Sequence, residues 1–313
     1  MRVTWQQAVR EAARCGFPHA ALVPAESVGE YVPNEEAVRQ GIKKDPRTFL
    51  PTARSVLVAA MPFAWYSAWP GGHAEVSAFY FQSQKAHEAI RRLEASLRAM
   101  GAEVLFEQRL PAKVLAHRAG IGAFGRNSLI RNEQWGSCFA LRLLMTDIEP
   151  QEELTCLSAP SCGDCTRCVI ACPVGALDGN GQVDVKRCIR AHMLTGEVVP
   201  EPLRDAMGTR LLGCEICQRV CPHNAKVSLV PVEPTVFSIE ALLTGSRSHL
   251  VEIGRQIGWN EARLQRIQSQ AAIAAGNTTD ARYIPLLEPL ARHTRPSIAE
   301  HAQWAIQKIL RER

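Results

Sequence analysis

The cysteines of this chain are numerous and regularly spaced, which makes them candidates for metal or redox chemistry. Nine of its 11 cysteines fall between Cys156 and Cys221, and eight of these nine follow a regular pattern. One run, Cys-x2-Cys-x2-Cys-x3-Cys-Pro, begins at Cys162, and a shorter run, Cys-x2-Cys-x3-Cys-Pro, begins at Cys214. In a chain without a secretion signal, such a cluster indicates metal binding rather than disulfide bonds.

The longer run has the spacing of bacterial ferredoxins, in which three thiolates of one tight loop reach a single [4Fe–4S] cluster. The fourth cysteine, which precedes a proline, serves the other cluster. The shorter run lacks its first cysteine, and the isolated Cys188 can supply that thiolate. The spacing predicts two [4Fe–4S] clusters with crossed ligands. Cluster 1 would take Cys162, Cys165, Cys168 and Cys221, and cluster 2 would take Cys172, Cys188, Cys214 and Cys217.

Zinc is the alternative, because Cys-x2-Cys pairs also bind structural zinc. The four-cysteine run places too many thiolates in one loop for tetrahedral zinc, and both prolines match the ferredoxin form. Two clusters in series indicate transfer of single electrons. A free ferredoxin would be far shorter than 313 residues, so the rest of the chain must serve the chemistry too.

The first 150 residues show the patterns of a mixed α/β domain. Apolar residues recur at helical spacing from Trp5 to Ala13, and residues 84–100 form a long amphipathic pattern that ends at Gly101. Short apolar runs predict buried strands. These runs are residues 20–23, 55–60, 102–106 and 137–148.

The remaining residues divide into a cysteine-rich segment and a helical one. Residues 151–230 hold few large apolar side chains, so the clusters are expected to act as the core there. Residues 225–240 are expected to form a linker. Three helical patterns follow, separated by turn-like pairs at Gly276-Asn277 and Arg295-Pro296, and they resemble one unit of a HEAT-type repeat. The predicted domains are residues 1–150, 151–230 and 231–313.

Composition is that of a globular protein. Hydrophobic residues make up 46% and charged residues 21%, with a net charge of +5. No apolar run approaches the roughly 18 residues of a membrane span. The N-terminus lacks an apolar signal core, which predicts a cytoplasmic protein. From Arg263 onward the chain has eight basic and four acidic residues, a difference of +4.

Several stretches together resemble the epoxyqueuosine reductase family, the iron–sulfur and cobalamin enzymes of tRNA queuosine biosynthesis. Residues 118–127 (RAGIGAFGRN) are similar to the family segment A-G-[IL]-G-x-x-x-[RK]-N. Gly136-Ser137 leading into residues 144–147 (LMTD), and residues 302–306 (AQWAI), are similar as well. The cysteine pattern matches, including Cys188 after QVDVKR. The resemblance covers most of the chain and is strongest over 114–225 and 265–310.

The resemblance implies an α+β protein with a nitroreductase-like α/β cobalamin domain, a ferredoxin-like domain with two [4Fe–4S] clusters and a C-terminal HEAT-like helical repeat. The clusters would reduce cobalamin to Co(I), which would open the epoxide of epoxyqueuosine in tRNA. The basic tail would grip the tRNA anticodon stem–loop through its phosphates. An external one-electron donor such as flavodoxin or ferredoxin is implied, and the protein is expected to be a monomer that does not bind membranes.

The resemblance also assigns cofactor contacts to the segment around the glycines. The residues concerned are Gly120, Gly122, Gly125, Arg126, Asn127 and Ser137. The three glycines have the spacing of a dinucleotide fingerprint, but they follow a helical stretch rather than a strand, which disfavours a Rossmann fold. They either let the backbone approach a bulky cofactor or simply form a tight turn.

Two segments depart from the family pattern. The family carries a catalytic aspartate fourteen residues before the first glycine, and Phe106 occupies that place here. The neighbouring Glu107, beside two apolar residues, is the candidate general acid, and the alternative is a surface glutamate at a strand end. Residues 77–87 keep Tyr80 and His87 but lack the arginine and aspartate of the family. These departures favour a divergent paralogue.

Three hypotheses follow. The first is a cobalamin-dependent iron–sulfur reductase that acts on epoxyqueuosine in tRNA. The second is a related corrinoid iron–sulfur reductase with a small-molecule or protein-cofactor substrate, motivated by the missing aspartate. The third is an electron-transfer module without its own catalysis.

Overall fold

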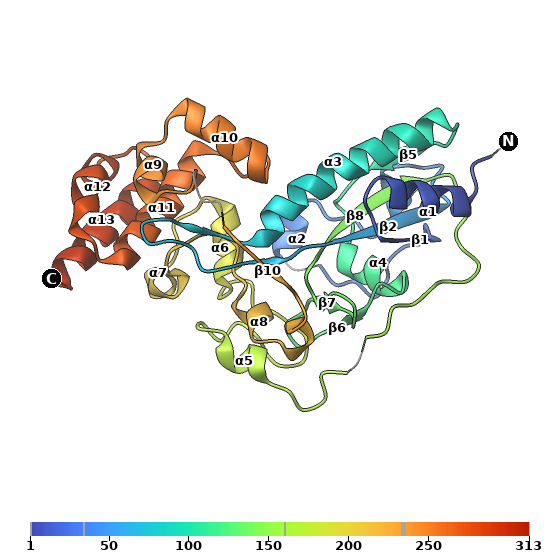
Figure 1. Ribbon diagram of the computed structural model, residues 1–313, viewed down its shortest axis with the longest axis horizontal. Helices are drawn as coiled ribbons and strands as arrows, with labels where there is room; N and C mark the ends of the chain where they lie inside the picture. The colour runs from blue at the N-terminus through green and yellow to red at the C-terminus, as the bar shows by residue number, and fades with distance from the viewer. Residues whose placement is uncertain (1, 34, 160, 233–235, 313) are drawn as a thin grey trace. The chain divides into compact units, whose positions relative to one another are not determined.

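The computed structural model describes residues 2–33, 35–159, 161–232 and 236–312. The chain divides into two compact units, each built from separate stretches of sequence (Figure 1). Unit 1 comprises Met1–Phe63, Gln82–Cys165 and Cys221–Val227, and unit 2 comprises Ala64–Phe81, Thr166–Val220 and Ser228–Arg313. The division therefore differs from the three consecutive domains expected at 1–150, 151–230 and 231–313.

A four-stranded antiparallel sheet, in the order β1-β2-β8-β5, is the centre of unit 1. Its strands are β1 (His19–Pro24), β2 (Ser55–Pro62), β5 (Val104–Phe106) and β8 (Phe139–Thr146). Leu57 of β2 lies opposite Leu22 of β1 and Leu144 of β8, so apolar side chains pair across these three strands. All four predicted strands are confirmed, with ends that differ by a few residues.

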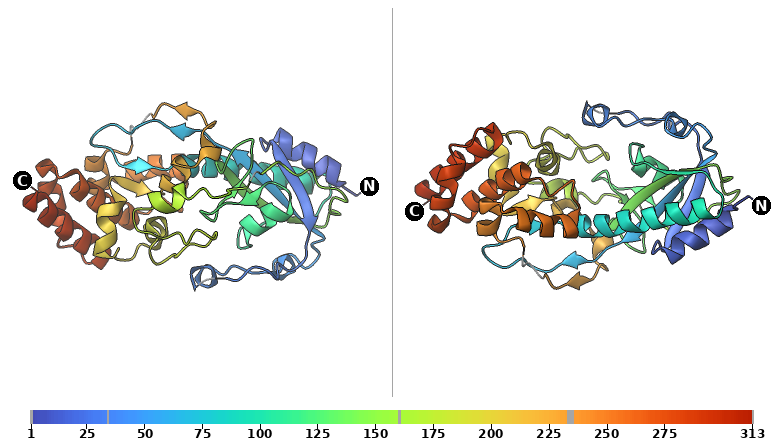
Figure 2. Two further views of the ribbon diagram at one scale, coloured as in Figure 1. Left: turned by 90° about the horizontal axis from the view of Figure 1, so that it is seen from below. Right: turned by 90° about the horizontal axis from the view of Figure 1, so that it is seen from above.

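Helices cover both faces of this sheet (Figures 1 and 2). Helix α4 (Ala112–Arg118) packs on the face that carries Val56, Val58 and Leu143. Helices α1 (Trp5–Arg14) and α3 (Ala78–Ala99) lie on the other face, where Ser96 Oγ donates a hydrogen bond of 2.8 Å to Glu11. The amphipathic helix expected at 84–100 is confirmed, and it begins earlier than predicted.

Buried Glu94 on α3 holds the edge strand β5 in place. Its carboxylate is 2.5 Å from Arg91 and 2.7 Å from Arg98, and it accepts a hydrogen bond of 3.1 Å from the backbone N–H of Phe106. Glu94 is only 2% exposed, so the two arginines compensate a charge that would otherwise be costly to bury. The smaller elements of unit 1 are α2 (Glu35–Arg39), the 3₁₀ helices at Pro46–Thr48 and Pro222–Asn224, β6 (Ala123–Phe124) and β7 (Ile130–Arg131).

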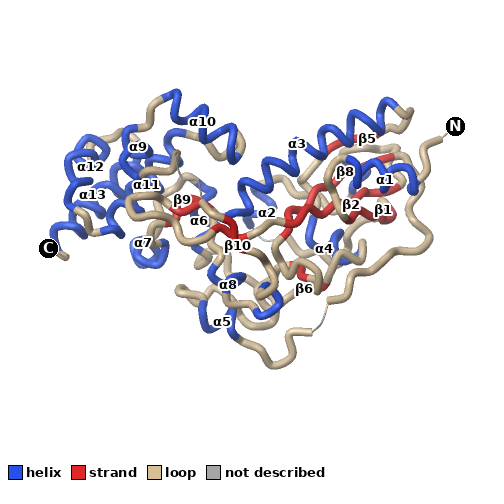
Figure 3. The backbone as a smooth tube through the Cα atoms, viewed as in Figure 1, coloured by secondary structure: helices blue, strands red, loops and turns tan. Residues whose placement is uncertain are grey.

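Unit 2 is mainly helical (Figure 3). Its helices are α5 (Arg167–Ala171), α6 (Ile189–Thr195), α7 (Glu201–Met207), α8 (Ile216–Arg219), α9 (Ile239–Thr244), α10 (Arg247–Ile257), α11 (Leu264–Thr278), the 3₁₀ helix Ala281–Tyr283, α12 (Ile284–Leu290) and α13 (Pro296–Arg311). Two short parallel ladders join β3 (Trp65–Tyr66) with β10 (Leu229–Val230), and β4 (Glu75–Val76) with β9 (Arg210–Leu212). Strand β10 falls in the segment expected to be a linker, of which residues 233–235 lie outside the described residues.

Two expectations about unit 2 were wrong. Gly276-Asn277 does not separate two helices but lies inside α11. A Cβ at Gly276 would stand 2.8 Å from the Cα of Ala305 on α13. The glycine therefore serves close helix packing. The cysteine-rich segment is not held by clusters alone, since Ile189, Met193 and Leu211 belong to the main hydrophobic core of the unit.

Buried His301 on α13 makes the stability of unit 2 depend on pH. Its Nε2 accepts a hydrogen bond of 2.9 Å from the Val199 N–H, and Nδ1 is 2.9 Å from Ser269 Oγ, which satisfies a neutral imidazole. Burial, followed by the charge of Arg204, lowers the pKa of His301 from 6.5 to about 4.

The folded state resists protonation of His301. The contribution of neutral His301 to the free energy of unfolding is therefore complete above pH 6.5 and is lost as the pH falls towards 4. We expect a loss of about 3 kcal/mol across that interval. Urea unfolding of the wild type and of H301Q at pH 7 and pH 4 measures it. The variant should lose less stability on acidification, and an equal loss in both proteins would contradict this role for His301.

None of the helices in the described ranges is long and apolar enough to cross a membrane.

Candidate functional site

Unit 2 brings five of the eight patterned cysteines together. Helices α5 and α8 pack against each other; α5 carries Cys168 and ends at Cys172, while Cys188 lies at the start of α6. Burial, followed by the charges of neighbouring thiolates, raises the pKa of the Cys217 thiol to about 12. The neighbours are Cys214, Cys188, Cys168 and Cys172. Thiols in this arrangement ionise readily only when a cation shares the site, so the donor set fits an iron–sulfur cluster.

The other three patterned cysteines lie in unit 1. Burial raises the pKa of Cys221, and the thiols of Cys162 and Cys165 raise it too, which places the three in one electrostatic neighbourhood. All eight patterned cysteines are half-buried, whereas Cys156 is exposed and Cys138 is buried. The structure thus groups Cys221 with Cys162 and Cys165, and Cys172 with Cys188, Cys214 and Cys217. Cys168, which is predicted for cluster 1, lies among the neighbours of Cys217. The individual ligand assignments remain predictions.

No three His, Cys, Asp or Glu side chains in the described part of the chain converge on a point that could hold one metal ion. A single zinc would require thiolates about 2.3 Å from one centre. A [4Fe–4S] cluster is larger, and each thiolate binds a different iron, so its ligands need not converge on one atom.

Glu215, which sequence analysis did not identify, anchors the segment from Cys214 to the start of α8, the helix that carries Cys217. Its carboxylate accepts hydrogen bonds of 2.6 Å from Ser77 Oγ and 2.9 Å from the Ala78 N–H, at the first residue of α3. A carboxylate at a helix N-terminus also interacts favourably with the helix dipole. The position of Glu215 between two patterned cysteines is the only sequence signal that could have revealed it.

The three glycines of the family-like segment face atoms of the chain itself. A Cβ at Gly120 would lie 2.6 Å from the Sγ of Cys156, and one at Gly122 would lie 2.3 Å from the carbonyl oxygen of Arg131. A Cβ at Gly125 would be 3.0 Å from Asn127 Oδ1. Gly120 also has a φ of +69°, which favours glycine at the end of α4. These contacts support the tight-turn interpretation.

The three polar residues assigned to the cofactor also contact the chain. Asn127 Oδ1 accepts a hydrogen bond of 3.3 Å from the Leu129 N–H, within the turn between β6 and β7. Arg126 donates a hydrogen bond of 2.8 Å to the carbonyl of Gly163, in the loop that carries Cys162 and Cys165. The Ser137 N–H donates a hydrogen bond of 2.8 Å to Asn224 Oδ1, three residues after Cys221.

The described contacts of these six residues position the cysteine-bearing segments of unit 1. Their assignment to cobalamin, which the resemblance implies, stays a prediction.

The surroundings of Glu107 favour an ionised carboxylate. It follows the last residue of β5, and its oxygens accept hydrogen bonds of 3.0 Å from Arg109 Nε and 2.9 Å from two backbone N–H groups. The hydrogen bond from Arg109 is the main cause that lowers the pKa of Glu107. A general acid must be protonated, so this pairing argues against that role.

We accordingly expect E107Q to retain turnover within about tenfold of the wild type, since a general acid typically contributes 10²–10⁴-fold. The variant should still weaken the loop, because the neutral amide loses the ion pair with Arg109. Initial rates across pH 5–9 measure the effect. A loss of ~100-fold or more, with iron content unchanged, would reinstate Glu107 as the acid.

Phe106 fills the position of the missing aspartate and packs on a histidine. The ring centroids of Phe106 and His87 are 5.3 Å apart in an edge-to-face arrangement, and the Arg91 guanidinium is 5.9 Å from the Phe106 centroid. Burial, followed by Arg142 and Arg91, lowers the pKa of His87. The imidazole, which belongs to the altered 77–87 segment, is thus favoured in its neutral form.

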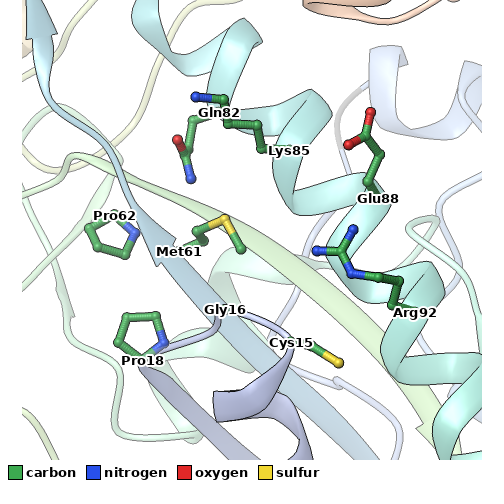
Figure 4. A pocket seen from close by; sticks show the side chains of 9 residues that line it. All are labelled: Cys15, Gly16, Pro18, Met61, Pro62, Gln82, Lys85, Glu88 and Arg92. Carbon is green, nitrogen blue, oxygen red and sulfur yellow. The ribbon is translucent and has the colours of Figure 1, made fainter.

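A pocket of about 560 Å³ opens in unit 1 between α3, the end of β2 and the residues after α1 (Figure 4). Lys85, Glu88 and Arg92 line it from α3, and Met61 and Pro62 give it an apolar floor. Its other lining residues are Cys15, Gly16, Pro18 and Gln82. None of the residues predicted from the sequence to act in catalysis or cofactor binding lines this pocket.

The two groups of cysteine thiols and the mixed fold define a redox protein with two iron–sulfur clusters. Residues 161–224 match the family model of a 4Fe-4S double cluster binding domain, which supports this class.

Longer comparisons identify the family. The chain is 30% identical to epoxyqueuosine reductase of Staphylococcus aureus, over 87% of this chain and 76% of the relative. It is 28% identical to the Bacillus subtilis enzyme over 92% of this chain and 80% of the relative. With the Escherichia coli enzyme, 33% identity extends over 64% of this chain and 54% of the relative. This chain belongs to the epoxyqueuosine reductase family and is an oxidoreductase.

Solved structures agree with the fold. A Bacillus subtilis epoxyqueuosine reductase with its catalytic loop swung out of the active site superposes with a TM-score of 0.79, at 25% identity, over 97% of this chain and 90% of that one. An epoxyqueuosine reductase in complex with an epoxyqueuosine-modified tRNA stem loop has a TM-score of 0.80 at 24% identity and covers 97% of this chain and 89% of that one.

Proposed function

We propose that this protein reduces the epoxide of epoxyqueuosine in tRNA to the alkene of queuosine. The observation that carries the proposal is 30% identity to an epoxyqueuosine reductase over 87% of the chain, together with the double-cluster match. The reduction removes the epoxide oxygen as water and consumes two electrons and two protons. Bound [4Fe–4S] clusters supply single electrons, which an external donor of the flavodoxin or ferredoxin type would replace.

The finer architecture of the proposal is a nitroreductase-like unit 1 and a HEAT-like helical part of unit 2. The antiparallel sheet covered by α1, α3 and α4 supports the first, and the packing of α13 against both α11 and α12 supports the second. Cobalamin remains part of the proposal through family membership, and the six residues first assigned remain its proposed contacts.

Exposed arginines of the C-terminal helices are the proposed contacts to tRNA phosphates. The structure reduces the available charge, because Arg266, Arg282 and Lys308 are paired with Glu261, Asp280 and Asp205. Besides the paired Arg282, the exposed basic residues in the described positions from 263 to 312 are Arg263, Arg292, Arg295 and Arg311. Such contacts predict tRNA affinity that falls steeply with salt.

The decisive experiment is anaerobic purification from cobalamin-supplemented cells, followed by assay on a tRNA stem–loop that contains epoxyqueuosine. Iron, cobalt and nucleoside products are quantified from the same preparation. About eight irons per chain and conversion to queuosine support the proposal, with four irons in each cluster. Eight irons without conversion of the modified base, even with bound cobalt, would remove this substrate.

One alternative function has a specific observation in its favour. Phe106 replaces the family aspartate, and the neighbouring Glu107 is held ionised by Arg109. A related reductase that acts on a small molecule or on another protein's cofactor would not need that acid. Salt-dependent tRNA binding would count against this alternative. Membership of an enzyme family already argues against an electron-transfer module without catalysis.

A further inference from the structure

Arg131 is a buried cation that the sequence analysis did not identify. It ends β7 and is 3% exposed. In the described ranges of the chain, Nε and Nη1 of its guanidinium have no hydrogen-bond partner. Arginine keeps its charge in proteins, and a buried charge is costly unless another group compensates it. The surroundings of Arg131 should therefore include an anion.

Both cysteine-bearing segments of unit 1 are attached to the hairpin that carries Arg131. At one end, Arg126 in the β6–β7 turn donates its hydrogen bond to the carbonyl of Gly163, between Cys162 and Cys165. At the other end, a Cβ at Gly136 would lie 2.7 Å from the carbonyl oxygen of His223, two residues after Cys221. The hairpin that carries Arg131 thus supports both segments that hold these thiols.

Electrostatic interactions link the Arg131 guanidinium to Cys221 and to His223, and Glu133 is a further charged residue that interacts with His223. Both Cys221 and His223 belong to the segment at the predicted cluster 1.

We propose that Arg131 compensates the charge of the iron–sulfur cluster whose ligands include Cys162, Cys165 and Cys221, and that it raises the reduction potential of this cluster. The inference rests on the cluster part of the proposed function. A thiolate-bound cluster is an anion that gains one further negative charge when it accepts an electron, so a nearby cation favours the reduced form. Burial keeps solvent ions from screening this effect.

The test is an EPR-monitored redox titration of the anaerobically purified protein, with iron quantified in each sample. R131M and R131Q remove the charge, R131K keeps it, and R54Q removes a half-exposed charge that is paired with Glu149. We expect the potential of one cluster to fall in R131M and R131Q while the other cluster is unchanged. R131K and R54Q should stay close to the wild type, and the shift should persist at high ionic strength.

Unchanged potentials in a neutral variant that contains full iron would overturn the proposal, as would an equal shift in R131K. If neither neutral variant assembles both clusters but R131K does, the requirement for charge is supported. If all three variants lose iron, Arg131 has a packing role instead. A wild-type protein that binds no clusters would defeat the proposed function itself, which keeps the two failures distinct.

Discussion

Serine in place of Cys217 is expected to remove one of the two clusters, so that iron falls from about eight to about four atoms per chain, and to abolish turnover. The physical reason is that Cys217 lies among four other patterned cysteines in unit 2, and its thiol is the most strongly perturbed of the group. Iron analysis and EPR spectra of the reduced protein measure the loss. C156S is the matched control, because Cys156 is exposed and outside the spacing.

Double variants test the crossed ligand arrangement directly. If Cys172 and Cys217 serve the same cluster, C172S/C217S keeps about four irons, whereas C162S/C172S loses nearly all of them. If each run of cysteines instead builds its own cluster, C162S/C172S keeps about four irons and C172S/C217S loses nearly all of them. The arrangement of thiols in the structure favours the first outcome, since Cys172 neighbours Cys217 and Cys162 neighbours Cys221.

Alanine in place of Gly136 is expected to destabilise unit 1 by about 2–4 kcal/mol and to release iron from the cluster that includes Cys221. A Cβ at this position would stand 1.9 Å from Asn224 Oδ1 and 2.7 Å from the carbonyl oxygen of His223, and the φ of +57° adds strain. The hairpin would have to move away from the segment that follows Cys221. Thermal unfolding and iron content measure the two effects.

Gly101 provides the matched control for this substitution. It has a φ of +95°, and a Cβ there would meet no atom within 4 Å. G101A therefore carries the backbone strain of a positive φ without the steric clash and should cost only about 1 kcal/mol, with full iron content. Equal losses of stability in the two variants would show that backbone strain, and not contact with Asn224, governs Gly136.

Local features of this protein were readable from the sequence. The strands around residues 20–23 and 55–60 were found because continuous apolar runs mark buried strands, and the helix at 84–100 because its apolar stripe has helical period. The double-cluster motif was found because ligand spacing within a loop is itself the geometric requirement. Membership of the epoxyqueuosine reductase family followed from the same residues.

Contacts between distant residues could not be read in this way. Gly276-Asn277 suggested a turn, yet Gly276 lies within α11. The residue is glycine there because Ala305 packs closely against it. The glycines at 120–125 matched a cofactor-binding pattern, yet the atoms they accommodate belong to Cys156 and Arg131. At Gly276 the local pattern allowed two meanings, and only the packed neighbour distinguished them. At 120–125 the packed neighbours favour a tight turn.

The sequence by itself determined the redox chemistry, because the number and spacing of the cysteines specify the thiolates available to each cluster. The tertiary structure decided which side chains support those thiolates. Ser137 and Asn224 are 87 positions apart, and Ser77 and Glu215 are 138 positions apart, so no periodicity or motif joins them. Their pairing follows from burial, which leaves each polar group to be satisfied by whatever the folded chain brings within reach.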